Sequence, residues 1–146
     1  MNAVNFFTKE EKALIKSAVK EAELNTSGEI RVHIENSCRT DVLDRAAWWF
    51  AKLAMQKTEQ RNGVLFYLAV KDKKFAILGD AGINAVTPED FWDQIKEKML
   101  AHFTAGKFAA GLQEGILMAG EQLKEHFPYQ DDDVNELSDD ISFGKV

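Results

Sequence analysis

The chain has 146 residues, of which 45% are hydrophobic and 29% charged, and its formal net charge of −6 gives a pI near 5.1. This length suits a single globular domain with one sizeable core, and the acidic balance argues against nucleic acid as a partner because phosphates would be repelled. Cys38 is the only cysteine, which excludes an intrachain disulfide and a metal site built on paired thiolates.

Targeting signals are not recognisable in the sequence. The first residues, MNAVNFFTKEEK, lack the basic start and apolar core of a signal peptide. No stretch reaches the roughly 18 apolar residues expected of a membrane span. We therefore expect a soluble, cytoplasmic protein without a membrane span.

The chain opens with a predicted helix followed by a predicted strand. In residues 8–25, Thr8 and Glu11 have the spacing of a capping box, and apolar residues then recur at helical intervals. Residues 29–35 alternate between apolar and polar side chains, which predicts a strand with one face wetter than the other. On that wetter face, His33 is expected to be exposed or half-buried rather than a metal ligand.

A second helix is predicted over residues 41–57, with Asp41 as its cap. Its apolar residues form one stripe, but Trp48 and Trp49 cannot both belong to it. Neighbours on a helix diverge by about 100°, so one tryptophan should face inward and the other outward.

Two strands follow in close succession. Residues 64–70 (VLFYLAV) are continuously apolar, as expected of a central strand covered on both faces. Residues 75–78 (FAIL) follow after the short polar turn KDKK. So short a connection predicts an antiparallel hairpin.

Two further helices and an acidic tail complete the chain. The first is predicted over residues 87–103, with Thr87 as its cap, and the second over residues 108–127. Pro128 should end the second helix. Residues 129–146 are strongly acidic and are expected to form a partly ordered tail outside a single domain of residues 1–128.

This order of elements predicts an α/β fold with helices on both sides of a short mixed sheet. The strand at 29–35, its helix and the strand at 64–70 should form a right-handed crossover and therefore run parallel. The hairpin strand then ends beside the beginnings of the other two. Glu29, Asn62 and Asp80 should consequently meet at one edge of the sheet.

Asp80 stands between two glycines, in Gly79-Asp80-Ala81-Gly82, which leaves two interpretations open. Gly-Asp-Ala-Gly is common turn chemistry, in which Asp80 would bend the chain or pair with Arg61. Alternatively, the meeting corners supply carboxylate, amide and carbonyl oxygens, which are the ligands that a hard cation prefers. A dinucleotide-type phosphate loop is disfavoured, because no GxGxxG leads directly from strand to helix.

Four blocks of the sequence resemble the TPM-domain family. They are TSGEIRV, KTEQRNGVLFYLA, KDKKFAILGDAGI and HFTAGKFAAGLQEGI, which span roughly residues 8–127 in the family's order. The family is typified by a thylakoid-lumen acid phosphatase, a photosystem II repair protein and a modulator of acetylcholine receptors. Many members are exported and membrane-anchored, features that this sequence does not show.

The resemblance implies a three-layer α/β/α sandwich with a divalent-cation site in loops at a sheet edge. It favours calcium, or another hard cation such as Mg²⁺, bound by Glu29, Asn62 and Asp80. An enzyme of this kind would hydrolyse phosphate monoesters, with Arg61 and Asp80 as the candidate catalytic residues. The alternative is a non-catalytic module that contacts a partner protein through an exposed tryptophan and the acidic tail, its loops stiffened by the cation.

Overall fold

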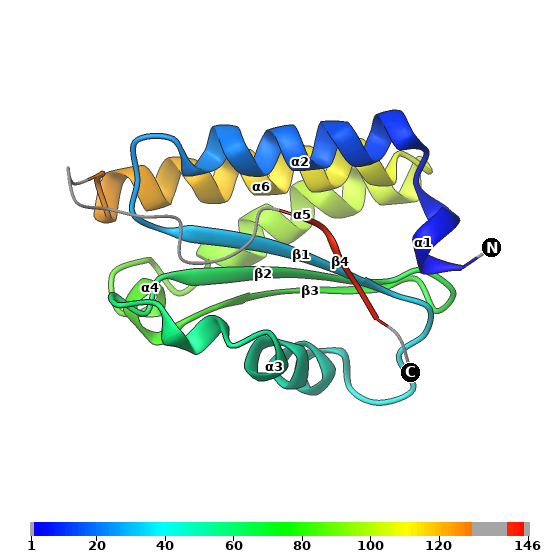
Figure 1. Ribbon diagram of the computed structural model, residues 1–146, viewed down its shortest axis with the longest axis horizontal. Coiled ribbons are helices and arrows are strands. Elements are labelled where there is room, and N and C mark those ends of the chain that lie inside the picture. Colours follow the sequence, from blue (N-terminus) through cyan, green and yellow to red (C-terminus); the bar gives the residue numbers. More distant parts are fainter. Residues whose placement is uncertain (1, 130–139, 145–146) are drawn as a thin grey trace.

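A computed structural model describes residues 2–129 and 140–144 (Figure 1). The helices are α1 (Ala3–Phe6), α2 (Lys9–Glu23), α3 (Val42–Lys52), α4 (Ala81–Asn84), α5 (Phe91–Thr104) and α6 (Phe108–His126), with a 3-10 turn η1 at Met55–Lys57. The strands are β1 (Glu29–Glu35), β2 (Gly63–Ala69), β3 (Lys74–Gly79) and β4 (Ser142–Phe143). Within these described residues, no helix is long and apolar enough to cross a bilayer.

The four strands form one mixed sheet in the order β3-β2-β1-β4. β1 and β2 run parallel, with Glu29 opposite Gly63, and β3 returns antiparallel to β2, with Gly79 opposite Val64. This is the predicted crossover followed by the predicted hairpin. β4 was not predicted; it lies parallel to the free edge of β1, with Ser142 opposite His33.

Helices cover both faces of the sheet, so that the fold is the expected α/β/α sandwich. α2, α5 and α6 lie on one side in Figure 1 and α3 lies on the other. Each side has its own hydrophobic cluster: the larger one joins the three long helices to alternate sheet residues such as Ile30 and Phe66. The smaller one joins α3 to the opposite sheet residues, among them Leu65 and Tyr67.

The prediction of a wet face on the first strand is wrong. Glu29, His33 and Glu35 are all at most 2% exposed, because α3 packs over that side of the sheet. Arg31 alone on that face is partly exposed. His33 is fully buried rather than exposed or half-buried. The alternation of residue types is real, but both faces of β1 are largely buried, and on the α3 side the polar side chains of β1 lie beside the smaller hydrophobic cluster.

The tryptophan prediction is confirmed: Trp49 is 8% exposed and faces the sheet, whereas Trp48 is 50% exposed. Two helix boundaries differ from expectation. α3 ends at Lys52 because Ala54 adopts a left-handed conformation (φ 59°) before the η1 turn. α5 begins at Phe91, since the Thr87 hydroxyl donates back to the Ile83 carbonyl instead of capping α5.

Candidate functional site

Three corners of the chain meet where β1 and β2 begin and β3 ends, as the topology predicted. The amide of Glu29 donates to the carbonyl of Asn62 (3.3 Å), and that of Asp80 to the carbonyl of Gly63 (3.0 Å). The amide of Gly82 donates to the carbonyl of Arg61 (2.9 Å). We call this end of the sheet the Asp80 edge.

Asp80 caps a short helix and pairs with an arginine. Its Oδ1 accepts a hydrogen bond from the Ala81 amide at the start of α4 (2.7 Å). Arg61 donates to the carboxylate twice, from Nε to Oδ2 and from Nη2 to Oδ1, each at 2.8 Å. The Asp80 side chain is 5% exposed, but that of Arg61 is 52% exposed. The hydrogen bonds that Arg61 donates to Asp80 raise the pKa of Arg61.

Asn62 carries an unsatisfied acceptor at the same edge. Asn62 is 1% exposed. Its backbone amide donates to the Thr58 hydroxyl (3.1 Å), and its side-chain Nδ2 donates to Ser27 Oγ (3.4 Å). Asn62 Oδ1 is buried without a hydrogen-bond partner. Glu29, the first residue of β1 at the same edge, is also buried, with 2% of its surface exposed. A buried orphan acceptor between two carboxylate-bearing corners is what a hard cation would satisfy.

The donor set at this edge is mixed rather than purely acidic. Among residues 2–129 and 140–144, no group of three His, Cys, Asp or Glu side chains is placed to hold a metal ion. A cation at the Asp80 edge would therefore combine carboxylate oxygen with the Asn62 amide oxygen and loop carbonyls, a combination that Ca²⁺ accepts.

The two glycines around Asp80 are needed for close approach. A Cβ on Gly82 would lie 2.2 Å from the Gln60 carbonyl oxygen, and one on Gly79 would lie 2.4 Å from the Trp92 ring. The hairpin end is thus pressed against the corner that carries Arg61 and Asn62. Gly79 and Gly82 fix the position of Asp80 relative to that corner.

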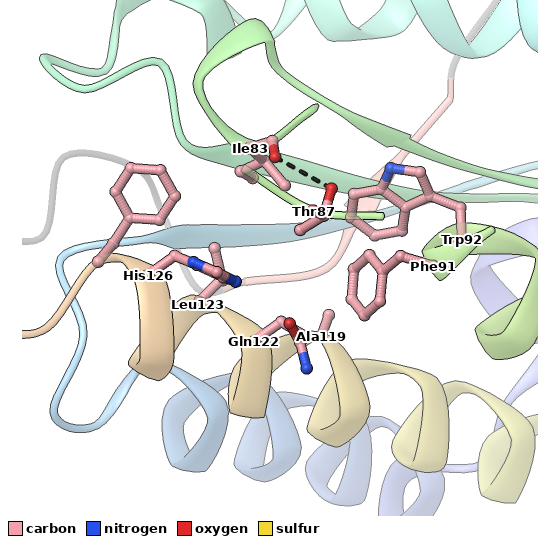
Figure 2. Close-up of a pocket in the computed structure, with 9 residues that line it drawn as sticks. Ile83, Thr87, Phe91, Trp92, Ala119, Gln122, Leu123 and His126 are labelled. Atoms are coloured by element: carbon pink, nitrogen blue, oxygen red, sulfur yellow. Dashed lines mark hydrogen bonds between the residues drawn. The ribbon is translucent and has the colours of Figure 1, made fainter. Parts of the chain in front are cut away.

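Apolar packing holds the edge against α6 (Figure 2). A pocket between α4, α5 and α6 has essentially no room for a water molecule. Leu123 of α6 lines it, and a Cβ on Gly28 would lie 2.8 Å from the Leu123 side chain. This pocket is tight packing beneath the edge and not a ligand cavity.

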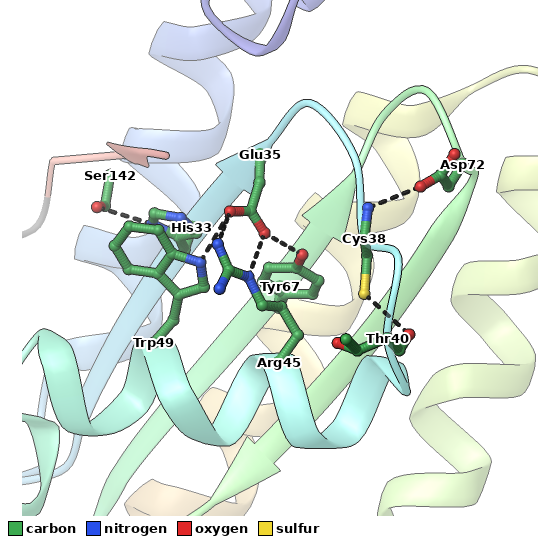
Figure 3. Close-up of polar contacts among 9 residues, drawn as sticks. All are labelled: His33, Glu35, Cys38, Thr40, Arg45, Trp49, Tyr67, Asp72 and Ser142. Carbon is green, nitrogen blue, oxygen red and sulfur yellow. Dashed lines mark hydrogen bonds and ion pairs between the residues drawn. The ribbon is translucent and has the colours of Figure 1, made fainter. Parts of the chain in front are cut away.

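A second polar cluster lies at the opposite end of β1 and was not predicted (Figure 3). The Glu35 carboxylate accepts hydrogen bonds from Arg45 Nε (3.0 Å) and Nη2, from Trp49 Nε1 (3.1 Å) and from the Tyr67 hydroxyl. His33 stacks on Trp49, with ring centroids 3.8 Å apart. We call these five residues the Glu35 cluster.

The charges of the Glu35 cluster are set by burial and by these hydrogen bonds. Burial alone would raise the pKa of Glu35, but donors from Arg45, Tyr67 and Trp49 together hold it below its usual value. Burial and the bond to Glu35 raise the pKa of Tyr67, which stays protonated. Burial lowers the pKa of His33 to about 4, so its imidazole is neutral near pH 7.

Sequence reasoning missed this cluster although part of the signal was present. Arg45 and Trp49 are four residues apart and so share one face of α3. His33 and Glu35 share one face of β1. What the sequence could not supply is the rotation of α3 that turns the first pair toward the second.

Cys38 is a packed thiol. It is 2% exposed, and its Sγ donates to the Thr40 carbonyl (3.3 Å). Its amide donates to Asp72 Oδ2 (2.7 Å), so the residue joins the loop after β1 to the β2–β3 turn. These contacts give Cys38 a structural role.

Comparison with known proteins identifies relatives of this fold. The NMR structure of the BA42 protein from the psychrophilic bacterium Bizionia argentinensis has 48% sequence identity and a TM-score of 0.89, covering 96% of this chain and 97% of that one. The N-terminal domain of a P. gingivalis protein shares the fold at 18% identity and a TM-score of 0.72, covering 86% and 83% of the two chains. The N-terminal domain of the cg2496 protein from Corynebacterium glutamicum also shares the fold, at 15% sequence identity and a TM-score of 0.60, covering 81% of this chain and 74% of that one.

A family model, rather than a curated protein, relates the sequence to known ones. No curated protein matches the chain significantly. The model of the TPM domain matches residues 1–122, which is most of the chain and includes β1, β2, β3 and the Asp80 edge. The chain therefore belongs to the TPM-domain family.

Proposed function

We propose that this chain binds a hard divalent cation, Ca²⁺ in the first place, at the Asp80 edge. Glu29 and Asp80 would provide carboxylate oxygens, and Asn62 would provide its amide oxygen. The observation that carries the proposal is the buried, unpartnered Asn62 Oδ1 at a point where three chain corners converge. Loop carbonyls and water would complete the six to eight oxygen ligands that calcium takes.

Binding at this edge requires Arg61 to give up Asp80. The Arg61 side chain is half exposed, so it can turn into solvent without being buried elsewhere. Asp80 is buried and would not tolerate losing its counter-charge, but the divalent cation replaces that charge while the exposed Arg61 guanidinium regains its hydration. Arg61 and the cation should therefore compete for the same carboxylate.

If the bound cation takes part in a reaction, we infer that the substrate is a phosphate monoester. The cation would supply Lewis-acid polarisation of a phosphoryl oxygen. Arg61, once released from Asp80, would donate to the phosphate of the substrate. Ser27 Oγ accepts a hydrogen bond from Gln60 Nε2 (2.9 Å), and the Thr58 hydroxyl accepts from the Asn62 amide. Among the described residues, neither hydroxyl donates to a carboxylate or an imidazole.

A non-catalytic role is the second candidate, and the exposure of Trp48 favours it. Trp48 is 50% exposed on the outer surface of α3. Large exposed aromatic side chains are typical anchors of protein–protein interfaces. In that case the cation would order the loops of the Asp80 edge without acting on a substrate.

Calcium titration followed by amide NMR tests the proposed site. In the wild-type protein, calcium should shift the amides of Gly28, Asn62 and Gly82 together. Asp80→Asn keeps the shape of the side chain but removes its charge, and should weaken binding at least about tenfold. Asp93→Asn, at an exposed position of α5, is the matched control and should bind as the wild type does.

Two results would overturn the proposal. One is unchanged calcium affinity in Asp80→Asn. The other is a set of shifts confined to residues 131–140, which would place the cation on the acidic tail. Turnover of a generic phosphomonoester by the wild type, with loss in Asp80→Asn, would then distinguish an enzyme from a binding module.

A further inference from the structure

A pocket opens at the end of the sheet opposite the Asp80 edge. It has a volume of about 410 Å³ and is lined by Glu35, Ser37, Arg39, Thr40 and Arg45. This volume is within the range of about 300–1,000 Å³ that small-molecule sites occupy. The pocket lies where the parallel strands β1 and β2 end, the position at which open α/β sheets commonly bind ligands.

Three side chains in this pocket have unused hydrogen-bonding capacity. The structure gives the Arg39 guanidinium, the Ser37 hydroxyl and the Thr40 hydroxyl no hydrogen-bond or ion-pair partner among the residues it describes. Arg39 and Thr40 are exposed, and Ser37 is half-buried. All three can donate hydrogen bonds to an anion that enters from solvent.

Arg45 is a second cation in the lining of this pocket, and it is held in place. Its Nε and Nη2 donate to Glu35, while Nη1 has no hydrogen-bond partner among the described residues. Its guanidinium lies 4.7 Å from the centroid of the Trp48 ring and 5.5 Å from that of Trp49. Ion pairing and stacking thus hold Arg45 in place before any ligand arrives.

The carboxylates around the pocket do not cancel its positive charge. Glu35 accepts four hydrogen bonds from three residues, and two of the four come from Arg45. Asp41 accepts from the amides of Leu43 and Asp44 at the start of α3. With Glu35 balanced by Arg45, Arg39 leaves the lining with one surplus positive charge in a chain of net charge −6.

The loop that carries these groups is fixed from the other side. The Asn36 carbonyl accepts from the Lys71 amide (2.8 Å), and the Cys38 amide donates to Asp72 (2.7 Å). Lys74 Nζ donates to the carbonyl of Cys38 (3.1 Å). A braced loop loses little conformational freedom on binding, which favours affinity for a small ligand.

We propose that this pocket binds a small dianionic oxyanion, the chemistry shared by inorganic phosphate and a phosphate monoester. Arg39 and Arg45 would neutralise the charge, and the hydroxyls of Ser37 and Thr40 would donate to the remaining oxygens. The proposal concerns binding alone, since the acceptor positions of Glu35 are already engaged and leave it no free lone pair for a general base. The inference does not depend on a cation at the Asp80 edge.

Titration of the full chain with inorganic phosphate, followed by amide NMR at constant ionic strength, tests the proposal. Phosphate should shift Ser37, Arg39, Thr40 and Arg45, and glycerol 2-phosphate should shift the same amides if the pocket accepts a monoester. Arg39→Gln should weaken phosphate binding about tenfold, the loss expected for one charge-assisted contact. Thr40→Val should weaken it by a smaller factor.

The matched control is Lys57→Gln. It removes the same charge from the η1 turn and should leave phosphate affinity unchanged. Arg45 is not a useful test position, since its removal would leave the buried Glu35 carboxylate unpaired. Because Arg39 is exposed and unpaired, its replacement should not unfold the chain.

Three outcomes would overturn the inference. Arg39→Gln could bind phosphate as tightly as the wild type, or acetate at equal ionic strength could give the same shifts with the same affinity. Phosphate could instead shift Ser27, Asn62 and Gly82, which would move the anion to the Asp80 edge. Failure of the calcium site, by contrast, would leave all of these expectations unchanged.

Discussion

Acidification should destabilise this protein through His33. The imidazole is 0% exposed, and its Nε2 is buried without a hydrogen-bond partner. Its Nδ1 shares a hydrogen bond with Ser142 (2.8 Å). Burial lowers the pKa of His33 to about 4; the charge of Glu35 opposes this shift, whereas Arg31 and Arg45 add to it. The folded protein thus resists protonation at this position.

The sign and size of the effect follow from the two pKa values. In the unfolded chain the imidazole has its ordinary pKa of 6.5, against about 4 in the folded protein. As the pH falls from 6.5 to 4, the unfolded state binds a proton that the folded state does not, so the free energy of unfolding decreases. Between pH 7.5 and 5 this single group should remove about 2 kcal/mol.

Urea unfolding of the wild type and of His33→Gln between pH 7.5 and 5 measures this contribution. The loss of stability should be smaller in the variant by about 2 kcal/mol. His102 and His126 are present in both proteins and cancel in the comparison. The pKa of Glu35 is lowered from 4.5, so that residue titrates below this window.

The reasoning would be refuted by parallel pH profiles for the two proteins. If His33→Gln does not fold, the ring signals of His33 in the wild type give the answer directly. Titration of those signals near pH 6.5 would show that the buried imidazole accepts a proton freely.

Two more expectations concern packing. In urea unfolding, Trp49→Ala should lower the free energy of unfolding by about 3–5 kcal/mol, because a buried ring and its hydrogen bond to Glu35 are lost. Trp48→Ala should lower it much less, and equal losses of stability would mean that both faces of α3 are covered. Deletion of residues 129–146 should leave a cooperatively unfolding domain, because Ile141 and Phe143 are only partly buried; loss of the thermal transition would contradict this.

The convergence of the Asp80 edge could be predicted because it depends on chain topology alone. A right-handed crossover and a short hairpin place the end of β3 beside the beginnings of β1 and β2. Neither step requires side-chain detail. The pairing of Asp80 with Arg61 was one of the open interpretations, and the structure contains it. The cation at this edge stays a prediction.

The Glu35 cluster could not be predicted because it depends on how two elements are rotated against each other. Periodicity shows which residues of β1 share a face, but not whether another layer covers that face. β4 is a similar case: its pairing with β1 spans two residues, too few to give a periodic signal in the sequence. The domain boundary at 128 and the acidic tail stay predictions, since residues 130–139 lie outside those that the structure describes.

Each end of the sheet carries a bidentate arginine–carboxylate pair, Arg61 with Asp80 at one end and Arg45 with Glu35 at the other, in different surroundings. Arg45 is 25% exposed and lies against two tryptophan rings, so its bond to Glu35 is held by packing as well as by charge. Arg61 is 52% exposed and makes no such ring contact among the described residues. A bidentate pair exchanges partners readily only where one member can move into solvent. This difference in exposure supports the two proposals, cation binding at the first end and oxyanion binding beside a fixed arginine at the second.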